Sequence, residues 1–272
     1  MNVEEIFRFN DSDELPLETL VSDGGFSAIF RTIACIGDSL SSGEHESLNE
    51  ENVRGFHDYF EHSWGQYIAR TIGAKVYNFS KGGMRADTYC ESFAESKGFW
   101  NPELRSDAYI LALGVNDITK YGKDLGDVDT DIDLEDWRNN KPTFVGYYAQ
   151  IIQRVREIEP KSRIFLMTIP RSTGAYNEAR AEACELHRQI LYKLAEIFEF
   201  TYILDFRKHA PVYDEEFKKH FYLGGHLNAM GYMLTAKMVM SYIDYIVRHN
   251  TEDFVQTGFI GKGGVHHKDR KW

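Results

Sequence analysis

The sequence predicts one α/β domain, a three-layer α/β/α sandwich built around a parallel sheet of about five strands. Two observations lead to this prediction. Short apolar runs rich in β-branched residues alternate with longer segments whose apolar residues recur at helical spacing. The short runs are apolar throughout, which is typical of strands that are covered on both faces. The length of 272 residues suits a single large domain of this kind.

The expected elements follow in chain order from these patterns. A first strand over residues 32–36 precedes a helix over 64–72, which Gly73 ends. The remaining expected elements are strand 74–79, a helix over 86–97, strand 108–113, helix 143–158, strand 164–169, helix 177–198, strand 202–206 and helix 228–247. Repeated strand–helix alternation favours a flavodoxin-like sheet with strand order 2-1-3-4-5. We expect residues 1–30 to form an N-terminal extension packed on a core domain of residues 31–250, with 251–272 as a C-terminal tail.

The composition excludes several classes of partner. Lys and Arg number 31 against 42 Asp and Glu, a formal net charge of -11 that disfavours nucleic acids and anionic membranes. No apolar run approaches the roughly 18 residues of a membrane helix, and residues 1–10 lack the apolar core of a secretory signal. Three cysteines, Cys35, Cys90 and Cys184, leave one unpaired, so we expect a reduced, cytoplasmic protein.

Ser39 is the most informative residue. It ends the motif Gly-Asp-Ser directly after the first expected strand, so a buried parallel strand delivers a serine onto a tight turn. Ligands of open α/β sheets bind at the carboxyl ends of strands, where this serine would lie. A plain turn followed by a helix N-cap is the alternative explanation of the motif when it is taken alone. Asp38, which precedes the serine, is expected to brace the turn.

Other strand ends and one late segment supply the partners that a serine nucleophile needs. The second strand is followed by a Gly82-Gly83 turn, the third by Asn116, and His226 opens the last helix. A serine hydroxyl needs a base within hydrogen-bond reach, and histidine is the usual base near neutral pH. A tetrahedral oxyanion needs preorganised donors, which a glycine N–H, an asparagine amide and the serine's own N–H can provide.

Taken together, these segments resemble the SGNH hydrolases, also called the GDSL lipase/esterase family. The nucleophile, glycine, asparagine and histidine blocks occur in the family's order between residues 33 and 232. The resemblance implies a flavodoxin-like fold, Ser39 and His226 as catalytic residues, and Ser39, Gly83 and Asn116 as the oxyanion hole. It implies no metal and no organic cofactor.

One position departs from the family pattern. The family usually places an aspartate three residues before the histidine, where this chain has Leu223. A main-chain carbonyl near Leu223 could accept the Nδ1–H of His226 instead, or another carboxylate could replace the aspartate, or the protein could be catalytically weak or dead. The carboxylates near that position in the sequence are Asp205, Asp214, Glu215 and Glu216.

These observations predict a serine esterase that cleaves short-chain acyl esters, acetyl esters above all, possibly on carbohydrate. The long segments 44–63 and 121–141 leave the carboxyl edge of the sheet and could shape access for a small-molecule ester. Their aromatic residues suit a sugar better than a long acyl chain; these residues are Phe56, Tyr59, Phe60 and Trp137. Two alternatives stay open, a non-catalytic binding module for an acylated or sugar ligand and an acyltransferase using the same serine. The oligomeric state is not predicted.

Overall fold

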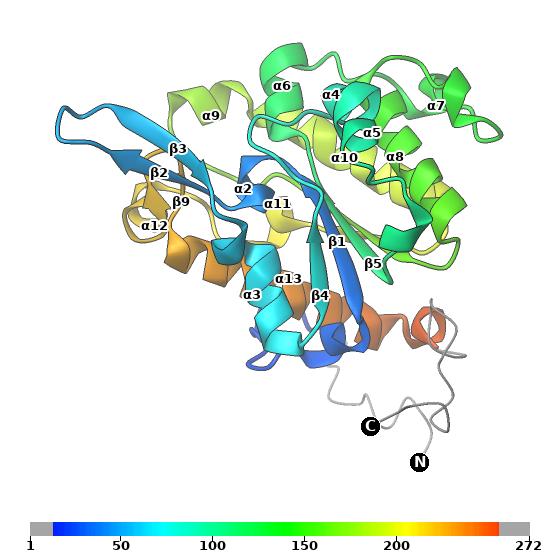
Figure 1. The fold of residues 1–272 in the computed structure, drawn as a ribbon, viewed down its shortest axis with the longest axis horizontal. Helices are drawn as coiled ribbons and strands as arrows, with labels where there is room; N and C mark the ends of the chain where they lie inside the picture. The colour runs from blue at the N-terminus through cyan, green and yellow to red at the C-terminus, as the bar shows by residue number, and fades with distance from the viewer. Residues whose placement is uncertain (1–12, 256–272) are drawn as a thin grey trace.

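The computed structural model describes residues 13–255 and confirms the expected sheet. Five parallel strands lie in the order β4-β1-β5-β6-β7, which among these strands is 2-1-3-4-5 (Figure 1). The strands are β1 (Thr32–Gly37), β4 (Lys75–Asn78), β5 (Ala108–Ala112), β6 (Arg163–Met167) and β7 (Thr201–Leu204). β1 lies between β4 and β5 and is buried, as its apolar sequence predicts.

Two helical layers cover the sheet because its strands alternate their side chains between two faces. In β1, Ala34 and Ile36 face one apolar core, whereas Ile33 and Cys35 face the other. The first core is completed by α4 (Ala86–Thr88), α5 (Ala94–Ser96), α6 (Val115–Tyr121), α8 (Phe144–Ile158) and α10 (Ala181–Ile197). The second is completed by α3 (Trp64–Ile72), α11 (Phe206–His209) and α13 (Ala229–His249), and Figure 1 shows α3 and α13 on the opposite side of the sheet from α8 and α10.

Strand register brings the three predicted site segments to one edge. Cys35 pairs with Asn78 of β4, and Gly37 pairs with Ala112 of β5. The turns that follow β1, β4 and β5 therefore emerge next to one another at the carboxyl edge of the sheet.

Two expected helices are interrupted. The helix expected over 86–97 contains a π-helical segment, Tyr89–Phe93, between α4 and α5. The helix expected over 177–198 is divided at Arg180 into α9 (Ala175–Ala179) and α10. The Arg180 guanidinium donates hydrogen bonds to the Val115 carbonyl and the Thr119 hydroxyl of α6, so this position serves a tertiary contact.

Several short elements were not expected from the sequence. The most important is an antiparallel hairpin of β2 (Glu44–Leu48) and β3 (Arg54–Asp58), which projects from the body of the molecule (Figure 1). A second pair joins β8 (Tyr222–Leu223) to β9 (His226–Leu227). The short helices are α2 (Ser39–Ser42), α7 (Val128–Asp131) and α12 (Glu215–Phe221), and the 3-10 turns are Gly25–Ile29, Phe60–His62, Pro102–Leu104, Trp137–Asn139 and Thr251–Phe254.

The segment before β1 packs on α13. The Val21 N–H donates to the Ser241 hydroxyl at 2.9 Å, and the Phe26 N–H donates to the Asp244 carboxylate at 2.7 Å. The first part of the expected extension and most of the expected tail lie outside the described residues. Among residues 13–255, no helix has the length and apolar character needed to cross a membrane.

Candidate active site

Ser39 lies at the first position of α2, directly after β1 ends at Gly37. The Asp38 carboxylate caps this helix by accepting a hydrogen bond from the Leu40 N–H at 3.1 Å, which is the bracing role expected of it. A Cβ atom at Gly37 would collide with the Ser41 side chain, so only glycine permits the turn. Within the described part of the chain the Ser39 hydroxyl makes no hydrogen bond.

The glycine segment lies beside the serine turn because backbone hydrogen bonds extend the sheet beyond β4. The Phe79 N–H donates to Cys35 O at 2.9 Å, and the Lys81 N–H donates to Gly37 O at 3.3 Å. Gly83 has a φ of 72°, in the left-handed region that favours glycine, and a Cβ there would meet no heavy atom within 4 Å. The left-handed backbone conformation, and not crowding by neighbouring atoms, is therefore the reason for a glycine at position 83. The space beside Gly83 is open.

Asn116 connects the predicted blocks. Its Nδ2 lies 3.1 Å from the Met84 carbonyl and 3.4 Å from Asp38 Oδ2, so one amide touches both the glycine segment and the serine turn. The longer contact is the weaker one. An oxyanion could therefore replace Asp38 as a partner of this amide without disturbing the bond to Met84.

His226 comes to the serine turn from the far end of the chain. It begins β9, which lies against α2, and Asn228 caps the following α13 by accepting from the Gly231 N–H at 3.0 Å. The imidazole is held between two carboxylates of β2. Its Nδ1 lies 2.7 Å from Glu46 Oε1, and its Nε2 lies 3.1 Å from Glu44 Oε1.

Glu46, and not a residue near Leu223, is the carboxylate at Nδ1 of His226. None of the four carboxylates considered from the sequence reaches Nδ1, because each one is bound elsewhere. Asp205 binds Arg188, Tyr192 and Thr168; Asp214 caps α12; Glu215 pairs with Lys218; and Glu216 pairs with His220. No carbonyl near Leu223 accepts from Nδ1 within the described residues. The carboxylate at Nδ1 is Glu46, on the hairpin after the nucleophile.

The surroundings of Glu46 keep it ionised and in place. Its side chain is buried, the Gly225 N–H donates to Oε1 at 2.7 Å, and Arg54 Nε lies 3.1 Å from Oε2 as an ion pair without hydrogen-bond geometry. Burial alone would raise the pKa of Glu46, but the hydrogen bonds from His226 and Gly225 and the charge of Arg54 outweigh it and lower that pKa. Gly224 has a φ of 70°, and a Cβ there would collide with this carboxylate.

One feature of the sequence relates the two glutamates to each other. Glu44 and Glu46 are two residues apart, so in a strand both side chains point to one face. The hairpin itself was hard to predict because β2 and β3 are short, polar and mostly exposed. Their stability comes from pairing and from contact with the site, and not from an apolar pattern.

Two further carboxylates near the site are buried. Burial raises the pKa of Asp38 to about 6, although its cap bond to Leu40 and the neighbouring His226 act in the opposite direction. Burial also raises the pKa of Asp117 to about 7. Asp117 accepts from the Ala86 N–H at 2.9 Å and so ties α6 to the start of α4, which follows the glycine segment.

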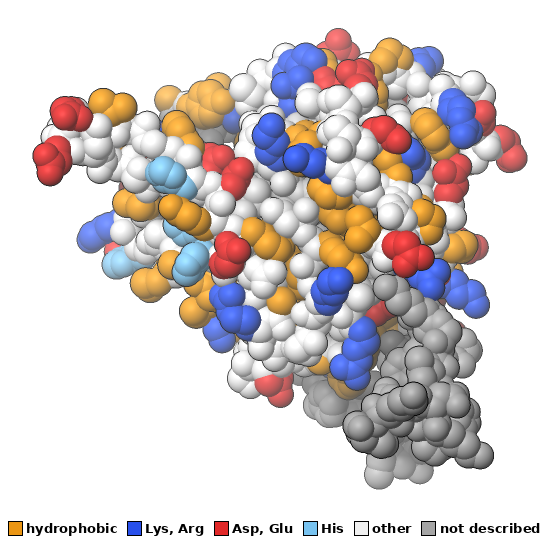
Figure 2. All heavy atoms as spheres, in the orientation of Figure 1, with side chains coloured by type: hydrophobic (Ala, Val, Ile, Leu, Met, Phe, Trp, Pro, Cys, Tyr) orange, Lys and Arg blue, Asp and Glu red, His pale blue; other side chains and the backbone are white. Residues whose placement is uncertain are grey.

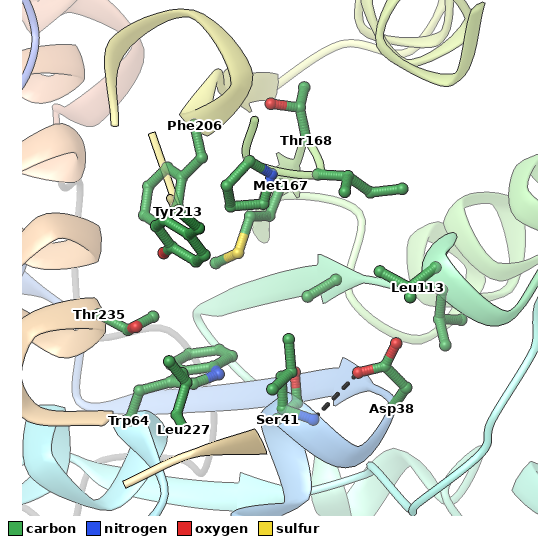
Figure 3. Close-up of a pocket in the computed structure, with 15 residues that line it drawn as sticks. Asp38, Ser41, Trp64, Leu113, Met167, Thr168, Phe206, Tyr213, Leu227 and Thr235 are labelled. Atoms are coloured by element: carbon green, nitrogen blue, oxygen red, sulfur yellow. Dashed lines mark hydrogen bonds between the residues drawn. The ribbon is translucent and has the colours of Figure 1, made fainter. Parts of the chain in front are cut away.

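An apolar cavity of about 60 Å³ adjoins the nucleophile turn. In Figure 3, Phe206, Met167 and Tyr213 lie on one side of it and Trp64 and Leu227 on the other. Both neighbours of the nucleophile, Asp38 and Leu40, belong to its lining, together with residues that follow β5 and β6; these include Leu113, Val115, Ile169 and Pro170.

Of the aromatic residues expected to line the site, some lie beside it and others lie elsewhere in the molecule. Phe56 is 57% exposed and places its ring edge-to-face with His226, with centroids 6.0 Å apart. Figure 2 shows histidine and hydrophobic side chains gathered where the hairpin projects, and Tyr59 is also exposed there. Phe60 packs into the core. Trp137 donates to Glu157 and lies against Arg154, so it belongs to another part of the surface.

The fold and this site define a class of protein. A parallel α/β sandwich presents a serine on a strand-end turn, a glycine and an asparagine beside it, and a histidine held by a buried carboxylate, which is the arrangement of a serine hydrolase. The sequence profile of the GDSL-like lipase/acylhydrolase family matches residues 35–234. The chain belongs to this family, also known as SGNH, and is an ester hydrolase. A search of curated proteins found no match.

Solved structures share the fold at low sequence identity. A family two carbohydrate esterase from Clostridium thermocellum, in complex with cellohexaose, is 15% identical with a TM-score of 0.50, covering 82% of this chain and 65% of the esterase. A carbohydrate esterase family 2 enzyme with a carbohydrate binding domain from Corynascus thermopiles is 14% identical with a TM-score of 0.52, covering 80% and 66%. A Lactobacillus plantarum protein is 15% identical with a TM-score of 0.58, covering 79% and 97%.

Proposed function

We propose that this protein hydrolyses short-chain acyl esters, acetyl esters above all, through an acyl-enzyme on Ser39. His226 Nε2 takes the Ser39 proton as the hydroxyl attacks the ester carbonyl, and then gives it to the leaving alkoxide. The N–H groups of Ser39 and Gly83 and the Asn116 amide hold the oxyanion. Water then attacks the acyl-enzyme, with His226 again as the base, and releases the acid.

The observation that carries this proposal is the 2.7 Å contact between His226 Nδ1 and Glu46 Oε1. A carboxylate at Nδ1 fixes the tautomer that leaves Nε2 able to accept a proton, and it stabilises the imidazolium that forms. The missing aspartate at Leu223 was the reason to consider a binding module without activity. The position of Glu46 supports the catalytic alternative, because a carboxylate hydrogen-bonded to Nδ1 can serve as the third member of a triad.

The cavity beside the nucleophile turn supports a short acyl group. An apolar cavity of about 150 Å³ holds benzene, so one of about 60 Å³ suits a group of only a few carbons. The exposed ring of Phe56, beside His226, offers a flat apolar surface to the alcohol part of the ester. A sugar or other polyol matches this surface together with its acidic neighbours.

Hydrolysis of p-nitrophenyl acetate by the wild type and by Ser39→Ala tests the proposal. We expect the wild type to turn over and to be labelled stoichiometrically by a fluorophosphonate, whereas Ser39→Ala does neither. Replacing p-nitrophenyl acetate by the octanoate should lower kcat/KM by at least an order of magnitude. Equal rates in the two proteins would refute the serine mechanism, and an unlabelled wild type that binds acetylated sugars would support a binding module.

A further inference from the structure

Glu44 is a second carboxylate on His226, and the mechanism above does not use it. Its Oε1 lies 3.1 Å from Nε2, the nitrogen that must accept the Ser39 proton. Its Oε2 lies so close to Gly82 that a Cβ at that glycine would collide with it. The carboxylate therefore spans the gap between the imidazole and the glycine segment, where the leaving oxygen of an ester would have to lie.

The contact requires a proton. Glu46 accepts from Nδ1–H, so a neutral imidazole would present only a lone pair at Nε2. An ionised carboxylate also presents only lone pairs, and two acceptors at 3.1 Å repel each other. A proton on Nε2 removes this repulsion and makes the contact an ion pair, which lies at 3.1 Å without hydrogen-bond geometry. The site then holds one proton more than the form in which Nε2 can act as a base.

The groups around this proton favour its retention. On the hairpin face that meets His226, Glu44 pairs across from Asp58, and Glu46 pairs across from Phe56. Asp38 faces the imidazole from the N-terminus of α2, and Arg54 forms an ion pair with Glu46. The pKa of Glu44 is raised, first by burial and then by the charges of Asp58 and Glu46, although His226 opposes this. Three carboxylates, those of Asp38, Asp58 and Glu46, and one cation, Arg54, thus surround the pair formed by Glu44 and His226. A proton on that pair reduces the repulsion among the carboxylates.

We propose that Glu44 competes with Ser39 for His226 Nε2 at rest, and that a hydroxyl group beside the ester oxygen of the substrate displaces it. This rests on the proposed function. A vicinal hydroxyl can donate a hydrogen bond to the carboxylate, which then moves away from Nε2, and the proton on Nε2 passes to water. Nε2 becomes free for Ser39, and the ester oxygen lies next to it. Glu44 is thereby a specificity-determining residue for esters of polyols.

The backbone at Glu44 is fixed, whereas its side chain can move away from His226. The Glu44 carbonyl accepts from the Tyr232 hydroxyl at 2.6 Å, which anchors the start of β2 to α13. Among the described residues no hydrogen bond reaches the Glu44 side chain, and its ion-pair partner is His226. Its displacement needs only a rotamer change, and removal of the side chain leaves the anchor intact.

The test compares propyl acetate with 2-hydroxypropyl acetate, which differ by one hydroxyl next to the ester group. We expect wild-type kcat/KM to favour the hydroxy ester by about tenfold, the effect of a hydrogen bond to a charged acceptor. Glu44→Ala should bring this ratio close to one and raise kcat/KM for propyl acetate severalfold, because the competitor of Ser39 is gone. Glu44→Gln, which lacks the charge, should move the acid limb of kcat/KM for propyl acetate to lower pH.

Glu216→Gln is the matched control, since Glu216 also pairs with a histidine, His220, but on the exposed face of α12. An unchanged ratio in Glu44→Ala would overturn the inference, as would equal losses for both esters in a folded variant. Should the variants not fold, the wild type alone decides: its ratio should grow as the pH falls from 8 to 6, and a constant ratio refutes the idea. Activity that persists in the wild type and disappears in Ser39→Ala keeps the proposed function intact in all these cases.

Discussion

Glu46 holds the imidazole of a residue 180 positions away in the chain. Glu46→Gln keeps the shape of the side chain but no longer fixes the reactive tautomer, because an amide can donate to Nδ1 as well as accept from it. We expect kcat for p-nitrophenyl acetate to fall by roughly 10²–10⁴-fold with little change in KM, as for triad carboxylates in other serine hydrolases.

The control for this change is again Glu216→Gln, and fluorophosphonate labelling of Ser39 supplies the second measurement. Slower labelling with an unchanged melting temperature indicates a positioning role in catalysis. A folded Glu46→Gln variant with wild-type kcat would show that another group orients His226.

For single residues, the sequence predicts the candidate reactive side chains but not the carboxylate that contacts the histidine. Ser39, Asn116 and His226 could be found because each follows a recognisable strand end or opens a helix. Glu46 could not, because its role depends on a polar hairpin whose residues show no apolar periodicity. The carboxylates nearest His226 in sequence are bound to other side chains, so proximity along the chain was a poor guide.

Among the elements, α6 and the glycine segment are joined by one buried carboxylate. Asp117 has no exposed surface, its Oδ2 finds no hydrogen-bond partner among residues 13–255, and burial raises its pKa to about 7. Between about pH 4 and pH 7 the unfolded chain therefore loses this proton while the folded protein keeps it. The contribution of Asp117 to stability falls as the pH rises through that window and is constant above it.

Asp117→Asn keeps the acceptor for the Ala86 N–H and removes the ionisation. We expect its free energy of unfolding, relative to wild type, to increase by roughly 2–4 kcal/mol from pH 4 to pH 7.5. Urea denaturation at both pH values measures this, with the exposed Asp129→Asn as control. A difference that does not change with pH would contradict the assignment of a buried neutral acid.

The hairpin and the interrupted helices show what element prediction missed. All five strands of the sheet follow from apolar runs, and α3 has the predicted bounds. The π-helical segment after α4 and the break at Arg180 arise from tertiary packing, which a helical pattern does not reveal. Of the unpredicted elements, the hairpin is the one that supplies two carboxylates to His226.

For the whole molecule, stability should reside in the two apolar cores and activity at the carboxyl edge of the sheet. Phe165 of β6 is fully buried between Phe30 and Tyr202, with ring centroids 5.9 and 5.7 Å away. Phe165→Ala should lower the free energy of unfolding by about 3–5 kcal/mol. Phe56→Ala, at an exposed phenylalanine, should change it by less than about 0.5 kcal/mol.

Urea denaturation measures both variants, and kcat for p-nitrophenyl acetate below the transition of Phe165→Ala completes the comparison. We expect the folded fraction of that variant to retain wild-type kcat. Equal losses of stability in the two variants would mean that the hairpin carries as much packing energy as the core.

The hairpin also limits how related chains can diverge. Glu44 and Glu46 reach His226 only because they share one face of β2, and successive strand residues alternate between faces. One residue inserted between Ser42 and Glu44 would turn His45 and Ser47 toward the imidazole and remove both glutamates. Residues added at the turn 49–53 would lengthen only the tip. Length variation among homologues that keep this triad should therefore be found at the tip of the hairpin and not at its base.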